Sequence, residues 1–289
     1  MKEHRTERDI NKMCSVLKVS RSGYYDWRKR VVSQRAQANE LLLCEIRKAY
    51  ELNRGLYGSP RITEELHSLG ISCNRKRVAK LMRNHGIMAK TKRKFKITTN
   101  STHRQPVAAN IVNQYFVAER PNQLWTSDIT YLWTREGWMY LSVILDVWSR
   151  QIVGYSMNNR LTTDLVTEAF KRAVQWRKIE TGMIFHSDRG SQYASTEMQH
   201  LLASYGIRPS MSSTGNCYDN AITETFFHTL KTELIYFNRY ETRKEASNSI
   251  FEYIEVFYNR RRRHSAIGYQ SPVHCRLNQP SSLLCRGDL

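Results

Sequence analysis

The chain has 289 residues, of which 40% are hydrophobic and 11% aromatic, so it can bury a sizeable core, which excludes a wholly disordered chain. Its length predicts about two domains. The formal net charge of +19 at pH 7 indicates a polyanionic partner, most often nucleic acid; a basic surface that only confers solubility is the alternative. Residues 1–100 contain 24 Lys and Arg against 9 Asp and Glu, a net +15, whereas residues 101–289 carry only +4.

The cysteines and the start of the chain indicate the compartment. The six cysteines are scattered and include no Cys-x-x-Cys pair, which argues against both a disulfide framework and a zinc site. The start, MKEHRTERDINK, is too charged for a secretory signal, and no apolar run approaches membrane-spanning length. We therefore expect a cytoplasmic protein associated with DNA, with no zinc and no membrane partner.

Residues 1–89 have the pattern of a helical DNA-binding region. In residues 8–30 a helical apolar spacing is interrupted by Ser-Arg-Ser-Gly and then resumes, which is the pattern of a helix-turn-helix. Residues 35–52 predict a longer amphipathic helix. A third helix is expected to start near Pro60 and stop near Gly70.

The next predicted helix, over residues 75–86 and capped by Ser72 or Asn74, is strongly basic and follows a short turn, as a DNA recognition helix does. An ordinary solvated surface is the alternative. The side chains expected to contact phosphates are Arg75, Lys76, Arg77, Lys80 and Arg83.

From residue 115 the pattern changes from helices to strands. Residues 90–114 are basic and then rich in Ser, Thr and Asn, which is typical of a linker. Three adjacent stretches with tight connections predict an antiparallel meander; they are 122–134, 137–149 and 150–157. Helices and strands then alternate, over 162–178 (helix), 183–188 (strand), 195–206 (helix) and 207–211 (strand), followed by a helix that contains Glu224. This order predicts an α/β fold of the ribonuclease H-like class, a mixed five-stranded sheet with helices, over 115–275, with a tail at 276–289.

Three acids lie where carboxylates from separate elements can converge. Asp128 lies in an apolar strand, where an unpaired carboxylate is costly, Asp188 ends another strand, and Glu224 lies on a helix. Singly, each acid is more often solvated or salt-bridged. Together they predict a site for Mg²⁺, or alternatively Mn²⁺, that performs phosphoryl transfer on DNA, because two such ions about 3.5–4 Å apart clamp the attacking and leaving oxygens.

Several basic or polar side chains are expected near this site. Lys231 lies seven residues after Glu224 and Asn220 four residues before it, so both share its helical face. Lys231 is expected to reach a DNA phosphate, with a surface Glu-Lys pair as the alternative, and Asn220 to contact DNA or cap the helix. Four successive arginines near the end cannot all point inward, and those expected at DNA are Arg260, Arg262 and Arg263.

Five stretches in order carry a resemblance to a known family. They are LWTSDITYLWT, LDVWSRQIVGY, FHSDRGSQY, GNCYDNAITETFFHTLKTE and YNRRRRHSAIGYQSP. They resemble the catalytic core of insertion-sequence transposases, most closely the second-frame (orfB-type) protein of the insertion-sequence family numbered three. The stretches YGSPRITEEL and NRKRVAKLM also resemble that family's helix-turn-helix segment, so the resemblance covers most of residues 8–275.

The resemblance implies which residues form the site. The family is similar to retroviral integrases and carries a DDE triad with 35 residues between the second aspartate and the glutamate. Here the first aspartate falls on Asp128, and 35 residues, 189 through 223, separate Asp188 from Glu224. The downstream basic residue falls on Lys231. Asp146 is an alternative candidate for a metal-holding acid, but it is expected to have a structural role. His186 is expected either to face the metals or to have a packing role in the protein interior.

The resemblance also implies an activity. The chain would be a metal-dependent DNA transposase that cleaves a strand at the ends of an insertion sequence and joins the freed 3′-hydroxyl to target DNA. The resemblance also implies that the partner is double-stranded DNA and that the protein acts as a homodimer or a larger assembly. It implies a bacterial host as well. The alternatives are a non-catalytic DNA-binding regulator, or a partial transposase product that needs an upstream fusion partner; a generic RNase H-type nuclease is disfavoured by the basic amino-terminal region.

Overall fold

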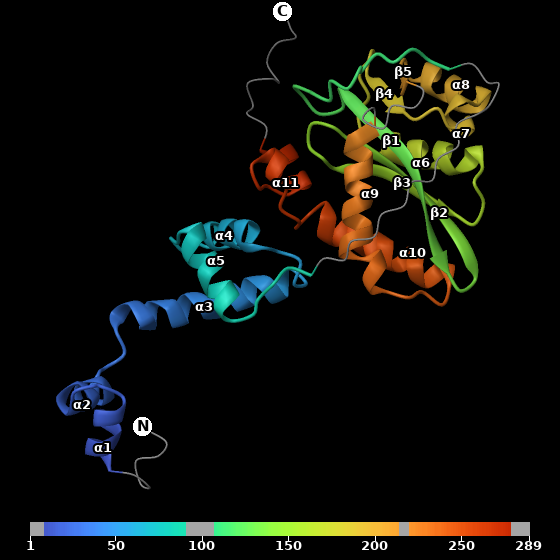
Figure 1. Cartoon of the computed structure of the whole chain (residues 1–289). Helices are drawn as coiled ribbons and strands as arrows, with labels where there is room; N and C mark the ends of the chain where they lie inside the picture. The colour runs from blue at the N-terminus through green and yellow to red at the C-terminus, as the bar shows by residue number, and fades with distance from the viewer. Residues whose placement is uncertain (1–8, 91–106, 214–219, 279–289) are drawn as a thin grey trace, which may run out of the picture.

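The computed structural model describes residues 9–90, 107–213 and 220–278, and its elements follow the order predicted from the sequence (Figure 1). The amino-terminal part is helical, as expected. Its helices are α1 (Ile10–Val16), α2 (Arg21–Lys29), α3 (Gln34–Leu52), α4 (Ser59–Ser68) and α5 (Arg75–Asn84). In Figure 1, α1 and α2 form a hairpin apart from the other helices, whereas α3, α4 and α5 pack together.

Capping residues set the ends of these helices. The Ser20 hydroxyl accepts the backbone N–H of Gly23 at 3.0 Å, so the predicted interruption separates α1 from α2. Asn74, rather than Ser72, begins α5, and its side-chain oxygen accepts the N–H of Lys76 at 2.7 Å. Gly70 follows α4 with a φ of +77°, a left-handed conformation that glycine adopts without strain, and it stops the helix as predicted.

The second part of the chain is built on one mixed sheet. Its strands are β1 (Leu124–Thr134), β2 (Gly137–Asp146), β3 (Ile152–Asn158), β4 (Ile184–Ser187) and β5 (Arg208–Met211). They form a five-stranded sheet in the order β3-β2-β1-β4-β5. The first three strands are antiparallel, and β4 and β5 run parallel to β1. This arrangement confirms the predicted ribonuclease H-like class.

Helices cover both faces of the sheet. The connecting helices are α6 (Thr163–Gln175), α7 (Ser191–Ala194), α8 (Thr196–Ser204) and α9 (Ala221–Glu233). Alternate residues of β1 point to opposite faces. Trp125 therefore packs in a cluster with Phe170 of α6, whereas Leu132 packs in a cluster with Phe226 of α9. The catalytic candidates on β1 and α9 consequently share one face.

The chain ends in short helical elements. They are η2 (Ile235–Phe237), α10 (Arg243–Glu252), the π-helix η3 (Tyr253–Tyr258), η4 (Ser265–Ile267) and α11 (Pro272–Leu277). None of the helices in the described ranges is both long and apolar enough to cross a membrane.

The amino-terminal helices and the sheet share one hydrophobic cluster, which includes Ile62 and Val78 as well as Leu132 and Phe226. Polar contacts reinforce it. The Tyr57 hydroxyl donates to the carbonyl of Arg261 at 3.3 Å and accepts the N–H of Arg263 at 2.8 Å. The domain boundaries predicted from composition remain predictions, and most of the predicted linker, residues 91–106, lies outside the described residues.

Gly154 on β3 shows how closely α6 packs on the sheet. A Cβ atom at this position would lie 2.3 Å from the Ala169 carbonyl oxygen and 2.7 Å from the Ala173 Cβ. We expect Gly154→Ala to lower the free energy of unfolding by about 1–3 kcal/mol through overpacking, measured by denaturant titration. Gly58→Ala is the control, because its Cβ would meet only Pro60 Cδ, at 3.7 Å. Equal stabilities of the two variants would contradict this packing.

Candidate functional site

The register between β1 and β4 places two acids together. Ser127 of β1 pairs with Ser187 of β4 in the parallel ladder. The next residues, Asp128 and Asp188, therefore emerge from neighbouring strands at the same edge of the sheet. The Asp188 carboxylate accepts the backbone N–H of Gly190 at 2.9 Å, and that of Asp128 accepts the N–H of Ile129 at 2.8 Å.

Glu224 reaches the same region from the start of α9. Two hydrogen bonds hold this helix against β1. The Thr223 hydroxyl donates to the Thr126 hydroxyl at 2.8 Å, and the Asn220 amide donates to the Ser127 carbonyl at 3.4 Å. Glu224 keeps access to solvent, but partial removal of its carboxylate from water raises its pKa.

The electrostatics of Asp128 reflect the charges of the other two predicted acids. Burial raises the pKa of Asp128 well above its ordinary value, and the charges of Asp188 and then Glu224 raise it further. The Ile129 N–H and Lys231 act in the opposite direction. Carboxylates supply the oxygen ligands that Mg²⁺ and Mn²⁺ prefer, so these three acids have the chemistry of such a site.

These carboxylates are not gathered at ligand distances. Within the described ranges, no group of three or more His, Cys, Asp or Glu side chains is arranged to hold a metal ion. The triad therefore remains a prediction, supported by the β1–β4 register and by the charges of Asp188 and Glu224, which raise the pKa of Asp128. Residues 214–219, which precede α9, lie outside the described residues.

Lys231 lies close enough to Asp128 for their charges to interact, and its contact with a DNA phosphate remains a prediction. Its ammonium lies 5.8 Å from the centroid of the Tyr131 ring. Burial lowers the pKa of Lys231, and the negative charge of Asp128 raises it. A half-buried cation beside Asp128 can stabilise a phosphate at the same place.

Tyr193 is a neighbour of the site that the sequence reasoning missed. It is 1% exposed, and its hydroxyl lies 2.8 Å from the Ser127 hydroxyl. Burial raises its pKa well above the ordinary value, and the charges of Asp188 and Asp128 raise it further. Its position five residues after Asp188, inside the motif FHSDRGSQY, is the signal that could have identified it.

Asp146 and His186 have structural roles. The fully buried Asp146 carboxylate accepts the backbone N–H groups of Asn122 at 3.0 Å and Ser149 at 3.1 Å, which confirms the structural role predicted for it. His186 is also fully buried, and its Nδ1 lies 2.9 Å from the Ser210 hydroxyl. The packing alternative therefore describes His186 better than a metal-facing one.

Two predicted DNA contacts lie inside the protein. Asn220 is 6% exposed and braces α9 on the Ser127 carbonyl, and its side chain makes no capping bond. Arg262 is 3% exposed, and its guanidinium donates to the Glu233 carboxylate at 2.6 and 2.9 Å. The predictions that these side chains contact DNA are wrong, because both are used to hold the fold.

A buried polar cluster surrounds Arg262. Tyr253 also donates to Glu233, at 2.7 Å, and Arg61 of α4 lies 3.8 Å from the same carboxylate. His264 Nε2 lies 3.0 Å from Arg262 Nη1. Burial and the positive charge of Arg262 lower the pKa of His264 to about 2, so its ring is neutral and accepts this bond. The cluster joins α4, α9 and the end of the chain.

The remaining predicted DNA contacts differ in exposure. Arg77 is half-buried, and its Nε donates to Asn39 of α3 at 2.8 Å. Arg263 is largely buried and donates to Glu65 at 2.6 Å and to Ser68 at 2.7 Å. The others, Arg75, Lys76, Lys80, Arg83 and Arg260, are exposed. The exposed residues are free of burial constraints and remain predicted contacts.

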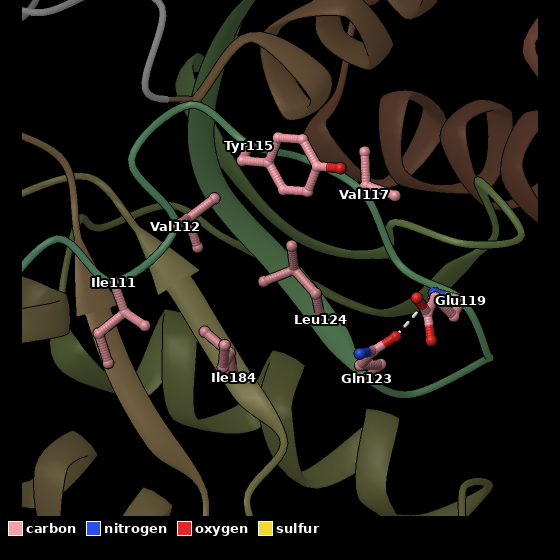
Figure 2. Close-up of a pocket in the computed structure, with 8 residues that line it drawn as sticks. All are labelled: Ile111, Val112, Tyr115, Val117, Glu119, Gln123, Leu124 and Ile184. Atoms are coloured by element: carbon pink, nitrogen blue, oxygen red, sulfur yellow. Dashed lines mark hydrogen bonds between the residues drawn. The ribbon is translucent and has the colours of Figure 1, made fainter.

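A hollow beside β1 lies away from the acids (Figure 2). Its floor includes Leu124 and Ile184, the first residues of β1 and β4, and Tyr115 lies over it. Asp128 and Asp188 follow at the other end of the β1–β4 pairing. The hollow is therefore distinct from the acidic site.

Comparison with known proteins adds the following relatives. Models described as "Integrase core domain" match residues 118–217 and 224–279, and one described as "HTH-like domain" matches residues 36–95. The "Insertion element IS600 uncharacterized 31 kDa protein" of Shigella sonnei is 46% identical over 261 residues, 90% of this chain and 96% of that protein. The "Transposase InsF for insertion sequence IS3A" of Escherichia coli (strain K12) is 43% identical over 274 residues, 94% of this chain and 95% of that protein.

Solved structures also match. The simian T-cell lymphotropic virus intasome in complex with PP2A regulatory subunit B56 gamma aligns with a TM-score of 0.48 at 18% identity, over 81% of this chain and 75% of that chain. The HTLV-2 integrase catalytic core domain in complex with magnesium (trimeric form) aligns with a TM-score of 0.44 at 17% identity, over 55% of this chain and 99% of that chain.

The Arg262–Glu233 pair should contribute strongly to stability. We expect Arg262→Met to lower the free energy of unfolding by about 3–5 kcal/mol, because it leaves a buried carboxylate without its cation. Arg260→Met, at an exposed neighbouring position, should change it by less than about 0.5 kcal/mol. Chemical denaturation of both variants measures the difference, and a small effect at Arg262 would contradict the burial of the pair.

Asp128 should destabilise the metal-free protein at neutral pH. Its raised pKa means that the folded protein holds this proton more tightly than the unfolded chain, so stability falls as the pH rises above the ordinary carboxyl range, near about 4. We therefore expect Asp128→Asn to raise the Tm at pH 7 in the presence of a chelator. The gain should shrink as the pH approaches about 4. Scanning calorimetry across this range tests it, and a lower Tm at pH 7 would refute the repulsion.

Proposed function

This chain belongs to the IS3-type family of insertion-sequence transposases, with an HTH-like domain before its integrase core domain, and we propose that it cleaves and joins DNA strands at the ends of an insertion sequence. The family confirms the resemblance that the sequence motifs carried. It also favours the transposase over the non-catalytic regulator among the predicted functions.

The β1–β4 register, which brings Asp128 and Asp188 together on neighbouring strands, is the observation that carries the proposed chemistry, and the charges of Asp188 and Glu224 raise the pKa of Asp128. We assign these three carboxylates as the holders of Mg²⁺ or Mn²⁺. A bound divalent ion would activate the attacking hydroxyl and stabilise the leaving oxygen. The carboxylates themselves supply the negative charge that attracts the ion, and burial of Asp128 strengthens this attraction.

The other residues of the site position the DNA and the acids. Lys231 lies where its ammonium can contact the scissile phosphate beside Asp128. Tyr193 and Ser127 support β1 directly below the aspartates. We assign no nucleophilic side chain, because water and then the DNA 3′-hydroxyl act as nucleophiles.

The partner in this proposal is double-stranded DNA, both the element ends and the target. The exposed basic residues of α5 would contact phosphates, since Arg75, Lys76, Lys80 and Arg83 all face solvent. Joining the ends of an element to one target requires at least two active sites in proximity, so we propose a homodimer or a larger assembly on DNA. Its place of action would be at DNA in a bacterial cytoplasm.

The triad is tested by Asp188→Asn. Losing one metal-holding carboxylate removes several kcal/mol of transition-state stabilisation, so strand cleavage and strand transfer should fall by a factor of about 10³ or more. Binding to end DNA, measured by filter retention over a salt series, should stay close to that of the parent protein. Asp164→Asn, an exposed acid at the start of α6, is the control and should retain activity. Undiminished cleavage by Asp188→Asn would rule out the assigned triad.

A further inference from the structure

An exposed group of aromatic side chains lies on the outer half of the β1–β2 hairpin. Trp133 and Trp138 are 58% and 46% exposed, although tryptophan is usually well buried. They are directly paired across the two strands. Tyr131, on the same face, is half-buried. We call these residues, Tyr131, Trp133 and Trp138, the aromatic platform.

The platform is held in a fixed shape. The rings of Trp133 and Trp138 have centroids 4.9 Å apart at 77°, and those of Tyr131 and Trp138 lie 5.1 Å apart at 89°. Such edge-to-face contacts are favourable, so the rings support one another. The other face of the hairpin is anchored in the core, where Leu132 is 4% and Met139 2% exposed. A rigid strand pair therefore presents aromatic rings to solvent.

Lys231 links the acidic site to the platform across the edge of β1, because Asp128 and Tyr131 point to opposite faces of this strand. Tyr131 follows Asp128 by three residues on β1. Lys231, which interacts with Asp128, also lies 5.8 Å from the Tyr131 ring centroid. The pairing of β1 with β4 stops at Ser127, so the described part of β4 does not cover the edge of β1 beyond the acids. Within the described residues, this edge of β1 separates Asp128 on one face of the strand from Tyr131 and Trp133 on the other.

The charged side chains near the hairpin tip have hydrogen-bond or ion-pair partners within the protein. Arg135 pairs with Glu241 at 3.2 Å, and the backbone N–H of Arg243 donates to the Glu136 carboxylate at 2.8 Å. The tip is therefore suited to contact an uncharged flat surface, while Lys231 supplies a cation for a phosphate. A nucleic acid strand offers both features, because its bases stack on aromatic rings and its backbone carries the charge.

We propose that the aromatic platform stacks against unpaired bases of the DNA strand that passes through the acidic site. This proposal rests on the proposed function, which places the scissile phosphate beside Asp128 and Lys231. Five residues of β1 separate Asp128 from Trp133, about 17 Å at about 3.3 Å per residue.

A second copy of this chain fits the platform less well. Each copy carries a net charge of +19, so two copies repel each other in the absence of a polyanion. A single DNA strand is attracted by the same charge. It also needs no sequence match, because every base has a face that can stack.

The test measures binding of a labelled, mixed-sequence single-stranded decamer by fluorescence anisotropy, without divalent metal. We expect the double variant Trp133→Ala with Trp138→Ala to bind at least about tenfold more weakly, as expected for lost base stacking. The double variant with Phe at both positions should retain most of the affinity, because it keeps flat rings. Trp176→Ala is the matched control, since Trp176 is 77% exposed at the end of α6 and should leave the affinity unchanged.

The outcomes are distinguishable. Equal affinities for the double Ala variant and Trp176→Ala would overturn the proposal. So would a change in oligomeric state at unchanged affinity, measured by analytical ultracentrifugation, because the platform would then contact a second copy. If the double Ala variant does not fold, photocrosslinking of the parent protein to a 5-iodouracil decamer decides: crosslinks on Trp133 or Trp138 support the proposal, and crosslinks only elsewhere refute it.

This assay is independent of the triad. Full cleavage by Asp188→Asn together with the expected loss in the Trp variants would refute the proposed triad and leave the platform in place. If Asp188→Asn loses cleavage while the Trp variants bind single strands unchanged, the triad is supported and the platform is refuted.

Discussion

The parallel pairing of β4 with β1 is the constraint on which the site depends. Because Ser127 pairs with Ser187, the following aspartates leave their strands side by side. A slip of one residue would turn one carboxylate to the opposite face. This register is maintained by the burial of the strands and by the hydrogen bonds that hold α9 on β1. The contact between the Tyr193 and Ser127 hydroxyls supports it further. Holding Asp128 near the negative charges of Asp188 and Glu224 lowers the stability of the folded state, and other contacts of the fold offset this loss.

Much of this arrangement could be predicted from the sequence, since strands and amphipathic helices leave local patterns. The alternation in residues 122–157 indicated the meander, and Asn74 was among the predicted caps. The resemblance to the transposase family, through its 35-residue spacing, singled out Asp188 and Glu224 as the predicted acids. Spacing along the chain carries no information about distance in space, however, so the sequence could not show how closely the three carboxylates approach.

The errors concern polar residues whose partners lie far away in the sequence. Arg262 stands in a run of four arginines, and composition predicts such a run to be exposed. Its partner Glu233 lies 29 residues earlier, so only the fold shows that the pair is buried. Asn220 is comparable, because it bonds to Ser127, 93 residues before it. Long-range pairing of this kind leaves no local periodicity to detect.

The cluster around Glu233 has a consequence for engineering and for evolution. Glu233 ends the helix that begins near Glu224, and it contacts Arg61 of the helix-turn-helix region and Arg262 near the carboxyl end. Arg263 likewise bonds to Glu65. The amino-terminal helices, which we propose bind DNA, are therefore not interchangeable modules. A chimera that takes its amino-terminal helices from a relative would lose matched ion pairs between these helices and the rest of the chain. Exchanging residues 260–263 together with the helices would preserve them.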